Sequence, residues 1–252
     1  MLEVKNLFVR YGSLTIVDGV SFSVKPGEWL MIVGPNGAGK STILNAVSQA
    51  VPYEGQVLFE GKDFAKLRSV QRAKSLGVLA QNHYVGYSFS VGEVVRLGRY
   101  AYAKGPLSPR DAEDEARVAD ALNKTGMEKL VNQSVLTLSG GELQRAFLAQ
   151  LFAQNPRLLM LDEPANHLDL VYQKQVFSLI GDWIRDTGRA VVSVVHDLSL
   201  ARAYGTRALL LHRGKIVSFG ETNEVLTRKN LEQVYAMDVY GWMRGLLSRW
   251  EE

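Results

Sequence analysis

A run of nine residues, GPNGAGKST, has the composition of a loop that binds phosphate. Its spacing is G-x-x-x-x-G-K-[ST], in which glycines bring backbone N–H groups to the phosphates, the lysine neutralises the β- and γ-oxygens and the hydroxyl binds Mg²⁺. The run stands between the apolar segment EWLMIV and a helical pattern, a context that a glycine-rich turn matching by coincidence would not need. We therefore predict a nucleoside triphosphate and Mg²⁺ at Gly34, Pro35, Asn36, Gly37, Ala38, Gly39, Lys40, Ser41 and Thr42.

Two carboxylates and a histidine follow two further apolar segments, RLLML and AVVSVV. The carboxyl ends of neighbouring parallel strands meet at the edge of a sheet where ligands bind. There Asp162 would join Ser41 in binding Mg²⁺, and Glu163 would polarise the attacking water as a general base. His196 would contact the γ-phosphate. Taken alone, an Asp-Glu pair after a strand is often a turn and a lone histidine is usually structural, but the phosphate loop favours the functional interpretation.

The segment VLTLSGGELQR predicts a helix that begins with exposed N–H groups. Ser139 and Glu142 have the spacing of a capping box, and Gly140 and Gly141 leave the first turn bare. Such a helix start binds anions, although no lysine stands nearby. A capped surface helix would explain Ser139 and Glu142 but not the two glycines, which lower helix stability. We therefore expect an anion at this helix start.

Short apolar strands alternate with helical patterns along the chain, which predicts a doubly wound α/β sheet. Between about residues 86 and 156 the pattern is mostly helical, which indicates a helical insertion. One of these helices is expected over 108–126, with Ser108 as its cap and Pro109 in its first turn. Other helices are expected over 64–75, 90–102, 170–186 and 198–204, and strands over 2–9, 15–24, 28–33, 56–61, 76–80, 157–161, 190–195, 207–212 and 215–220.

The composition excludes several classes of protein. The chain has 252 residues, of which 46% are hydrophobic and 22% charged, as in an ordinary soluble protein. A net charge of +3 without a basic block argues against nucleic acid as a partner, and the absence of cysteine excludes disulfides. No run reaches the roughly 18 apolar residues of a membrane span, and the start is unlike a signal peptide. We expect a cytosolic protein, or one peripheral to a membrane.

Taken together, six motifs resemble the nucleotide-binding subunits of ATP-binding-cassette (ABC) transporters: GPNGAGKST, VLAQ, LSGGE, LLMLDEP, NHLD and VVHD, in that order. LSGGE separates that family from other ATPases with a phosphate loop, and the resemblance covers nearly the whole chain. It implies an α/β fold with a P-loop NTPase core, a mixed sheet, an N-terminal antiparallel β-subdomain and an inserted helical subdomain. The single ABC ATPase domain would span 1–252, with its core at 1–85 and 157–252 and the helical subdomain at about 86–156.

The resemblance also implies which molecule supplies the anion for the LSGGE helix. Two subunits of this family pair head to tail around two ATP molecules. Ser139, Gly140, Gly141 and Glu142 of one copy would then bind the ATP that Lys40 holds in the other copy. This arrangement would explain an anion site without a lysine, because the lysine comes from the partner chain.

Three more residues take their roles from the resemblance. Tyr11 would stack on adenine, although a tyrosine at the end of a strand is by itself more often a packing residue. Gln81 would bind Mg²⁺, contact the attacking water and signal to a membrane partner. Asp169, in NHLD, would cross the dimer interface near the partner's site.

Subunits of this family act on a polytopic membrane permease, which importers combine with a substrate-binding protein. We expect the permease to dock beside residues 82–90, where Tyr84 and Tyr87 supply apolar surface. The alternative is that these aromatic side chains only pack the helical lobe onto the core. The chain would lie at the cytoplasmic face of the membrane as a peripheral subunit.

Weaker similarities favour one subfamily. SFSVGEVVRLGRYAY, HDLSLARAYGTRALLLHRGKIVSFGETNEVLT and LEQVYAMDV resemble the ATPases of iron-siderophore, haem and cobalamin importers, with molybdate-type and other metal-chelate importers next. The alternatives are a soluble ABC ATPase without a transporter, such as an iron–sulfur-cluster assembly ATPase, and an ABC protein acting on DNA or ribosomes. The complete set of site residues argues against a non-catalytic cassette. The tail YGWMRGLLSRW is expected to pack on its own domain rather than to lie on a membrane surface.

Overall fold

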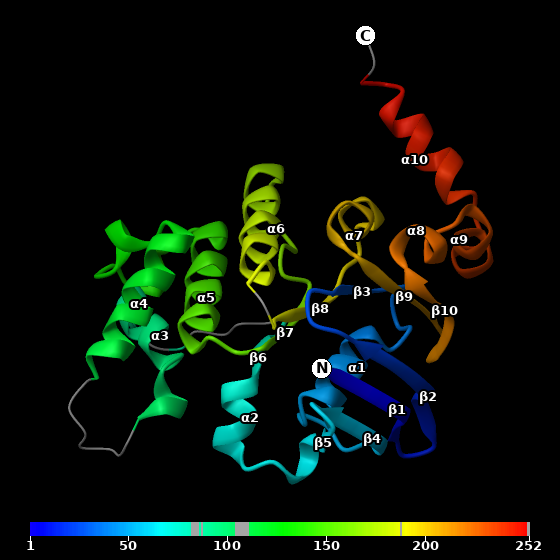
Figure 1. Ribbon diagram of the computed structural model, residues 1–252. Helices are drawn as coiled ribbons and strands as arrows, with labels where there is room; N and C mark the ends of the chain where they lie inside the picture. The colour runs from blue at the N-terminus through cyan, green and yellow to red at the C-terminus, as the bar shows by residue number, and fades with distance from the viewer. Residues whose placement is uncertain (82–85, 87, 104–110, 187, 251–252) are drawn as a thin grey trace. The chain divides into compact units, whose positions relative to one another are not determined.

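The computed structural model describes residues 1–81, 86, 88–103, 111–186 and 188–250. The chain forms two compact units. Figure 1 labels their helices and strands. The first unit comprises Met1–Val24, Glu28–Asp63 and Ser193–Glu252, and the second comprises Lys25–Gly27 and Phe64–Val192.

The first unit contains an antiparallel sheet of four strands in the order β2-β1-β4-β5. Leu2, Val4, Leu7 and Val9 of β1 are buried while most of the residues between them are exposed, so one face of this strand packs on the interior. The four strands are β1 (Leu2–Tyr11), β2 (Leu14–Val24), β4 (Glu54–Phe59) and β5 (Lys62–Asp63).

A second group of strands in the first unit has the order β10-β9-β3-β8. β3 (Trp29–Val33) runs parallel to β9 (Arg207–His212), and β10 (Lys215–Glu221) returns antiparallel to β9. All five residues of β3 are buried, as expected of a strand covered on both faces. The helices of this unit are α1 (Lys40–Val47), α7 (Leu198–Tyr204), α8 (Thr222–Val225), α9 (Arg228–Tyr235) and α10 (Val239–Leu247).

The second unit holds the parallel pair β6 (Leu76–Leu79) and β7 (Leu158–Asp162), with the start of β8 (Ala190–Val194) beside β7. β7 is buried throughout. The rings of Phe152 and Trp183 stack, with their centroids 6.2 Å apart. The helices are α2 (Ser69–Ser75), α3 (Val91–Leu97), α4 (Ala112–Thr125), α5 (Gly140–Gln154) and α6 (Leu170–Ile184), with short 3-10 helices at Phe64–Lys66, Tyr100–Tyr102, Glu128–Leu130 and Val135–Thr137.

A buried arginine fastens the helices α3, α4 and α5 of the second unit to one another. Arg99, only 8% exposed, follows α3, donates to Asp114 Oδ1 in α4 at 2.8 Å and donates to the Ala153 carbonyl oxygen in α5 at 2.8 Å. A buried charge is stable only when it is paired and hydrogen-bonded. The contact therefore holds α5, the LSGGE helix, in a defined place among its neighbours.

The predicted strands and helices are present in the structure, and the α/β class with a mixed sheet and a separate antiparallel sheet is confirmed. α4 begins later than expected, because the carboxylate of Asp111 caps the Glu113 N–H; the expected cap at Ser108 lies outside the described residues. The division into a core at 1–85 and 157–252 and a helical subdomain at 86–156 stays a prediction. Among the described residues, no helix combines the length and the apolar composition that crossing a membrane requires.

Candidate functional site

The phosphate loop follows β3 in the first unit, and its geometry requires its glycines. Gly34, Gly37 and Gly39 have φ angles of 151°, 75° and 99°, which residues with a Cβ rarely adopt. A Cβ on Gly34 would also lie 2.1 Å from the Leu211 carbonyl oxygen, and one on Gly39 would lie 2.8 Å from the Ile16 carbonyl oxygen. The backbone therefore turns tightly between β3 and α1, as a loop that wraps phosphates must.

Lys40 begins α1 and reaches back over the loop. Its Nζ donates hydrogen bonds to the carbonyl oxygens of Gly34 and Pro35, both at 2.9 Å, and the residue is only 5% exposed. Ser41 and Thr42 complete the first turn, where backbone N–H groups point along the helix axis toward an anion. The structure thus brings the predicted lysine, hydroxyl groups and glycines together in one loop.

The turn between β9 and β10 supports this loop, a contact that the motifs do not indicate. The Gly214 N–H donates to the Ala38 carbonyl oxygen at 3.0 Å, and the Asp18 N–H donates to the Gly214 carbonyl oxygen at 2.9 Å. Gly214 has a φ of 78°, and a Cβ there would lie 2.5 Å from the Ile16 carbonyl oxygen. Gly214 therefore joins the phosphate loop to β2. Its signal in the sequence is only an arginine-glycine turn between two predicted strands.

Gly214→Ala is expected to weaken ATP binding roughly tenfold, because backbone strain of about 1–3 kcal/mol would be relieved by moving the turn away from Ala38. Gly61→Ala is the matched control: Gly61 has a similar φ of 77°, but a Cβ there meets nothing within 4 Å. Titration with a fluorescent ATP analogue measures both variants. Equal affinities would show that the turn does not position the loop.

His196 lies at the edge of the first unit where β3 enters the phosphate loop. The Val195 N–H donates to the Ile32 carbonyl oxygen at 3.2 Å, so the chain after β8 runs beside β3 up to the residue before His196. His196 itself is exposed. Its contact with a γ-phosphate stays a prediction, and its placement at this edge agrees with that role.

Tyr11 lies at the tip of the β1–β2 hairpin, paired with Leu14. Tyr11 is 53% exposed, whereas a tyrosine that only packs against the core would be buried. β2 contacts the phosphate loop two residues beyond Leu14, where Ile16 approaches Gly39. The hairpin tip therefore stands near the loop with an aromatic ring available for stacking.

The second unit brings Gln81 and Glu163 together. Gln81 Nε2 donates to Glu163 Oε2 at 2.9 Å, and Asn166 Nδ2 donates to the same oxygen at 2.6 Å. Asp162, the residue before, ends β7 and is only 7% exposed. Two amides thus orient one carboxylate oxygen of Glu163, as a general base requires. The part played by Asn166 was missed, although it stands in the NHLD motif.

The backbone at Glu163 is strained. Its φ is 53°, in the left-handed region that residues other than glycine rarely occupy. Strain of this kind costs about 1–3 kcal/mol and is concentrated at functional sites. His167, four residues on, has a φ of 60° in the same segment. The segment after β7 therefore holds Glu163 and His167 in backbone conformations that cost stability.

The start of α5 confirms the predicted capping box. Ser139 Oγ accepts from the Glu142 N–H at 3.4 Å, while the Ser139 N–H and Oγ donate to Glu142 Oε2 at 2.8 and 2.7 Å. These bonds from Ser139 lower the pKa of the Glu142 carboxyl below its ordinary value. Glu142 therefore serves as a charged cap, and its contact with nucleotide stays a prediction.

The two glycines of LSGGE differ in what surrounds them. A Cβ on Gly141 would lie 2.6 Å from the ring of Tyr172 in α6, so Gly141 is needed for packing between α5 and α6. A Cβ on Gly140 would meet only Leu168 Cδ2, at 3.9 Å. Packing therefore explains Gly141 but leaves Gly140 bare, as an anion site requires. Asp169 caps α6 by accepting from the Tyr172 N–H at 3.0 Å, and its role across an interface stays a prediction.

The predicted site residues are thus divided between the two units. Tyr11, the phosphate loop and His196 belong to the first, and Gln81, Asp162, Glu163 and the start of α5 belong to the second. The part of the chain that the structure describes has no cluster of three or more His, Asp or Glu able to hold a metal by itself. The predicted ligand set of one hydroxyl, one carboxylate and one amide suits Mg²⁺, which takes oxygen ligands and completes its shell with phosphates and water.

Comparison with known proteins identifies the family. A model of the ABC transporter family matches residues 17–166. The hemin import ATP-binding protein HmuV of Streptomyces coelicolor is 42% identical over 234 residues, covering 92% of this chain and 82% of that protein. The ferric enterobactin transport ATP-binding protein FepC of Escherichia coli is 36% identical, covering 94% of this chain and 87% of that protein. The chain spans 54% of YvrA, an uncharacterised ABC transporter ATP-binding protein of Bacillus subtilis that is 36% identical.

Two solved structures share the fold. One is an inward-facing conformation of a metal-chelate type ABC transporter, with a TM-score of 0.81 and 27% identity over 94% of this chain and 89% of that chain. The other is a dimeric bacterial ABC transporter cassette, with a TM-score of 0.78 and 26% identity over 88% of this chain and 99% of that chain. Both confirm the P-loop α/β fold and the resemblance stated from the motifs. The chain belongs to the ABC transporter family, among its ATP-binding subunits.

Proposed function

We propose that this chain hydrolyses ATP to power a membrane importer of an iron-siderophore, haem, cobalamin or related metal chelate. The observation that carries the ATPase part of the proposal is the start of α5, which is capped, bare at Gly140 and distant in sequence from the phosphate loop. The relatives named for hemin import and ferric enterobactin transport support the importer class. The metal-chelate type neighbour supports the class of cargo.

Each group in the site has a defined task in this proposal. The phosphate loop binds the ATP phosphates through backbone N–H groups, and Lys40 neutralises the β/γ-oxygens. Ser41, Asp162 and Gln81 would hold Mg²⁺, which stabilises the charge that develops on the phosphates. Glu163 takes the proton of the attacking water, held in position by the amides of Gln81 and Asn166.

Two copies would close head to tail around two ATP molecules, with Ser139, Gly140 and Gly141 of each copy on the ATP held by the other. The dimeric cassette among the similar structures supports this pairing. In this arrangement the N-terminus of α5 meets a γ-phosphate, where the helix dipole and the bare N–H groups favour negative charge.

Tyr11→Ala is expected to weaken ATP binding, because stacking on a base contributes about 1–3 kcal/mol, roughly five- to 150-fold in affinity. Tyr11→Phe retains the ring and should bind ATP like the unmodified chain. Leu14→Ala is the matched control, because Leu14 lies on the same hairpin tip and is 61% exposed. Titration with ATP and with inorganic triphosphate separates adenine from phosphate contacts. A loss of affinity for both ligands would contradict stacking.

A polytopic permease and a substrate-binding protein would complete the transporter, with this subunit on the cytoplasmic face of the membrane. Tyr84 and Tyr87, the residues expected beside the permease, lie outside the described residues. Phe89 of the same segment is 42% exposed, and its carbonyl oxygen accepts from the Val135 N–H at 2.9 Å. Docking of the permease near this segment stays a prediction.

The test is reconstitution with a polytopic permease whose gene is found next to that of this chain. We expect the two to purify together, and cargo-loaded binding protein to stimulate ATP hydrolysis in proteoliposomes. Failure to purify with a permease, together with binding to iron–sulfur assembly proteins, would instead support the soluble ABC ATPase. The import names of the relatives favour the transporter.

A further inference from the structure

One side of α5 faces the segment 163–168, which follows β7 in the second unit. Gly140 and Gln144 lie four residues apart and share that side of the helix. A Cβ on Gly140 would meet Leu168 Cδ2 at 3.9 Å. Gln144 Nε2 donates a hydrogen bond to the Pro164 carbonyl oxygen at 2.6 Å. The bare start of α5 and Pro164 are therefore joined by one turn of helix.

The carbonyl group of Pro164 requires a donor from outside its own segment. Pro164 is buried, and buried backbone carbonyl groups are almost always hydrogen-bonded. The backbone bonds of this turn reach the carbonyl oxygens on either side of it. The Asn166 N–H donates to Glu163 at 3.1 Å, and the Leu168 N–H donates to Ala165 at 3.4 Å. The side chain that reaches across from α5 therefore supplies the bond to Pro164.

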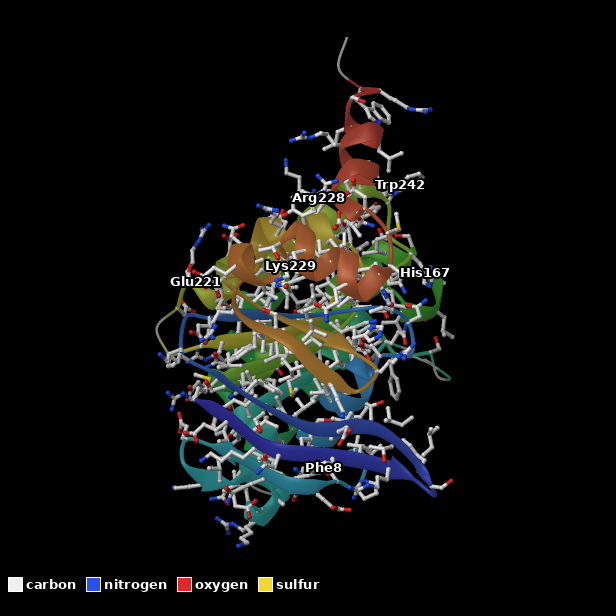
Figure 2. All side chains as sticks on the ribbon, turned by 90° about the vertical axis from the view of Figure 1, so that its right-hand side faces the viewer. Phe8, His167, Glu221, Arg228, Lys229 and Trp242 are labelled. Atoms are coloured by element: carbon white, nitrogen blue, oxygen red, sulfur yellow. The ribbon has the colours of Figure 1, made fainter. Side chains whose placement is uncertain are left out.

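A hydrogen bond at the Pro164 carbonyl group also orients the peptide of Glu163. The proline ring fixes φ at about −65°, and the peptide bond before it is planar, so only ψ of Pro164 rotates freely between the two carbonyl groups. Glu163 has a φ of 53°, a conformation that persists only where its surroundings enforce it. His167, labelled in Figure 2, has a φ of 60° in the same segment. The bond from Gln144 is one of the contacts that enforce this backbone.

The segment 163–168 is also held from α6, which packs closely on α5. Gln173 Nε2, on α6, donates to the Leu168 carbonyl oxygen at 3.0 Å. A Cβ on Gly141 would lie 2.6 Å from the ring of Tyr172, and the Arg145 guanidinium lies 5.8 Å from the centroid of that ring. A glutamine side chain thus holds the segment near each end. A displacement of either helix would therefore displace the segment.

We propose that Gln144 is a positioning residue for ATP hydrolysis, which sets Glu163 of its own chain in the conformation of a general base. It acts through the Pro164 peptide rather than on ATP itself. This role rests on the proposed function, in which Glu163 accepts a proton and the start of α5 meets the partner's ATP. One helix would then serve both sites of the pair. Its start binds the ATP of the partner, and Gln144, one turn further, prepares Glu163 for the ATP of its own chain.

Methionine in place of Gln144 tests this role, because it has a similar length and no donor. Gln144→Met is expected to lower kcat about ten- to hundredfold, as a small displacement of a catalytic group does. The affinity for a fluorescent ATP analogue should not change, because the phosphate loop belongs to the first unit. An unchanged kcat would overturn the proposal. A parallel loss of affinity would show general damage to the fold and would overturn it as well.

Gln150→Met is the matched control. Gln150 lies on the same helix, but beside Gly98 at the end of α3. This variant should hydrolyse ATP at the unmodified rate. A fall in kcat equal to that of Gln144→Met would show that α5 as a whole is sensitive to the substitution, and would overturn the proposal.

A second variant separates the hydrogen bond from the volume of the side chain. Gln144→Glu keeps the shape of glutamine, but an ionised carboxylate has no proton to donate. It should show the same fall in kcat as Gln144→Met. An unmodified rate in Gln144→Glu would overturn the proposal even if Gln144→Met failed to fold.

A double-mutant cycle tests whether Gln144 acts through Glu163. If it does, Gln144→Met should cause no further loss in a chain that already carries Glu163→Gln, because the group it positions is gone. Independent effects would multiply, so a further fall of about tenfold in single-turnover hydrolysis would overturn the proposal. An unmodified rate in Glu163→Gln alone would instead contradict the proposed role of Glu163, whichever result Gln144→Met gives.

Mixed dimers show which chain depends on Gln144. Each contains one Lys40→Ala chain, so only one phosphate loop binds ATP. With Gln144→Met on the Lys40→Ala chain, the rate should equal that of a Lys40→Ala chain paired with an unmodified chain. With Gln144→Met on the chain whose Lys40 and Glu163 act, the rate should fall about ten- to hundredfold. The reverse pattern would assign Gln144 to the anion site at the start of α5 and would overturn the proposal.

Discussion

Glu163→Gln is expected to reduce ATP turnover by about 10²–10⁴ while leaving ATP binding intact, because a positioned general base contributes a factor of this size. Glutamine has the shape of glutamate, so its amide oxygen can accept the hydrogen bonds that Gln81 and Asn166 donate to Glu163 Oε2. The left-handed backbone conformation at residue 163 should also persist, because the two side chains have the same shape. The variant should therefore lose proton transfer without losing its fold, and it should accumulate as an ATP-bound dimer.

Single-turnover hydrolysis and ATP titration measure this prediction together. Glu113→Gln is the matched control, since Glu113 pairs with Arg117 on the surface and an exposed ion pair contributes little to stability. The control should hydrolyse ATP at the unmodified rate. Hydrolysis by Glu163→Gln at that same rate would show that another group accepts the proton.

A mixed dimer of Lys40→Ala and Gly140→Leu chains is expected to recover ATP hydrolysis that neither variant has alone. Lys40→Ala removes the charge that holds the β/γ-phosphates, and Gly140→Leu blocks the anion site at the start of α5. If each ATP lies between Lys40 of one copy and Gly140 of the other, one site of the mixed dimer carries both defects and the other site is intact. Recovery should reach about half of the unmodified rate, as one of two equivalent sites would give.

The choice of Gly140 rather than Gly141 follows from the structure. A side chain at Gly141 would collide with Tyr172, so its loss of activity would report damaged packing, whereas the surroundings of Gly140 are open. Hydrolysis and retained ATP per dimer are both measured in heterodimers purified through two different tags. If the heterodimer retains one ATP but does not hydrolyse it, both sites must act together. If it neither retains nor hydrolyses ATP, the shared site is contradicted.

Interactions close in sequence could be predicted from the residues themselves. The phosphate loop depends on glycines at fixed offsets, and the Ser139–Glu142 cap depends on two residues three apart. In both, the partners are neighbours along the chain, so their spacing determines their geometry. The family could be predicted for the same reason, because each of its motifs is a short run of neighbouring residues.

Contacts between distant segments were decided only by the tertiary structure. The Gly214 N–H supports the phosphate loop by donating to the Ala38 carbonyl oxygen. Gln81 and Asn166 both donate to Glu163 Oε2. The ring of Tyr172 leaves no room for a side chain at Gly141. Gly140 and Gly141 are indistinguishable as letters, and only the packing of α6 against α5 assigns them different roles.

The C-terminal tail shows the same limit. Its helical spacing was visible in the sequence. The expectation that it packs on its own domain holds for Tyr240, whose Oη donates to the Leu226 carbonyl oxygen, and fails for Trp242 and Trp250, which are exposed. Apolar periodicity determines that a helix has an apolar face. Which residues of that face are covered depends on where α7, α8 and α9 end in space, and side-chain burial is a property of the folded chain rather than of any local pattern.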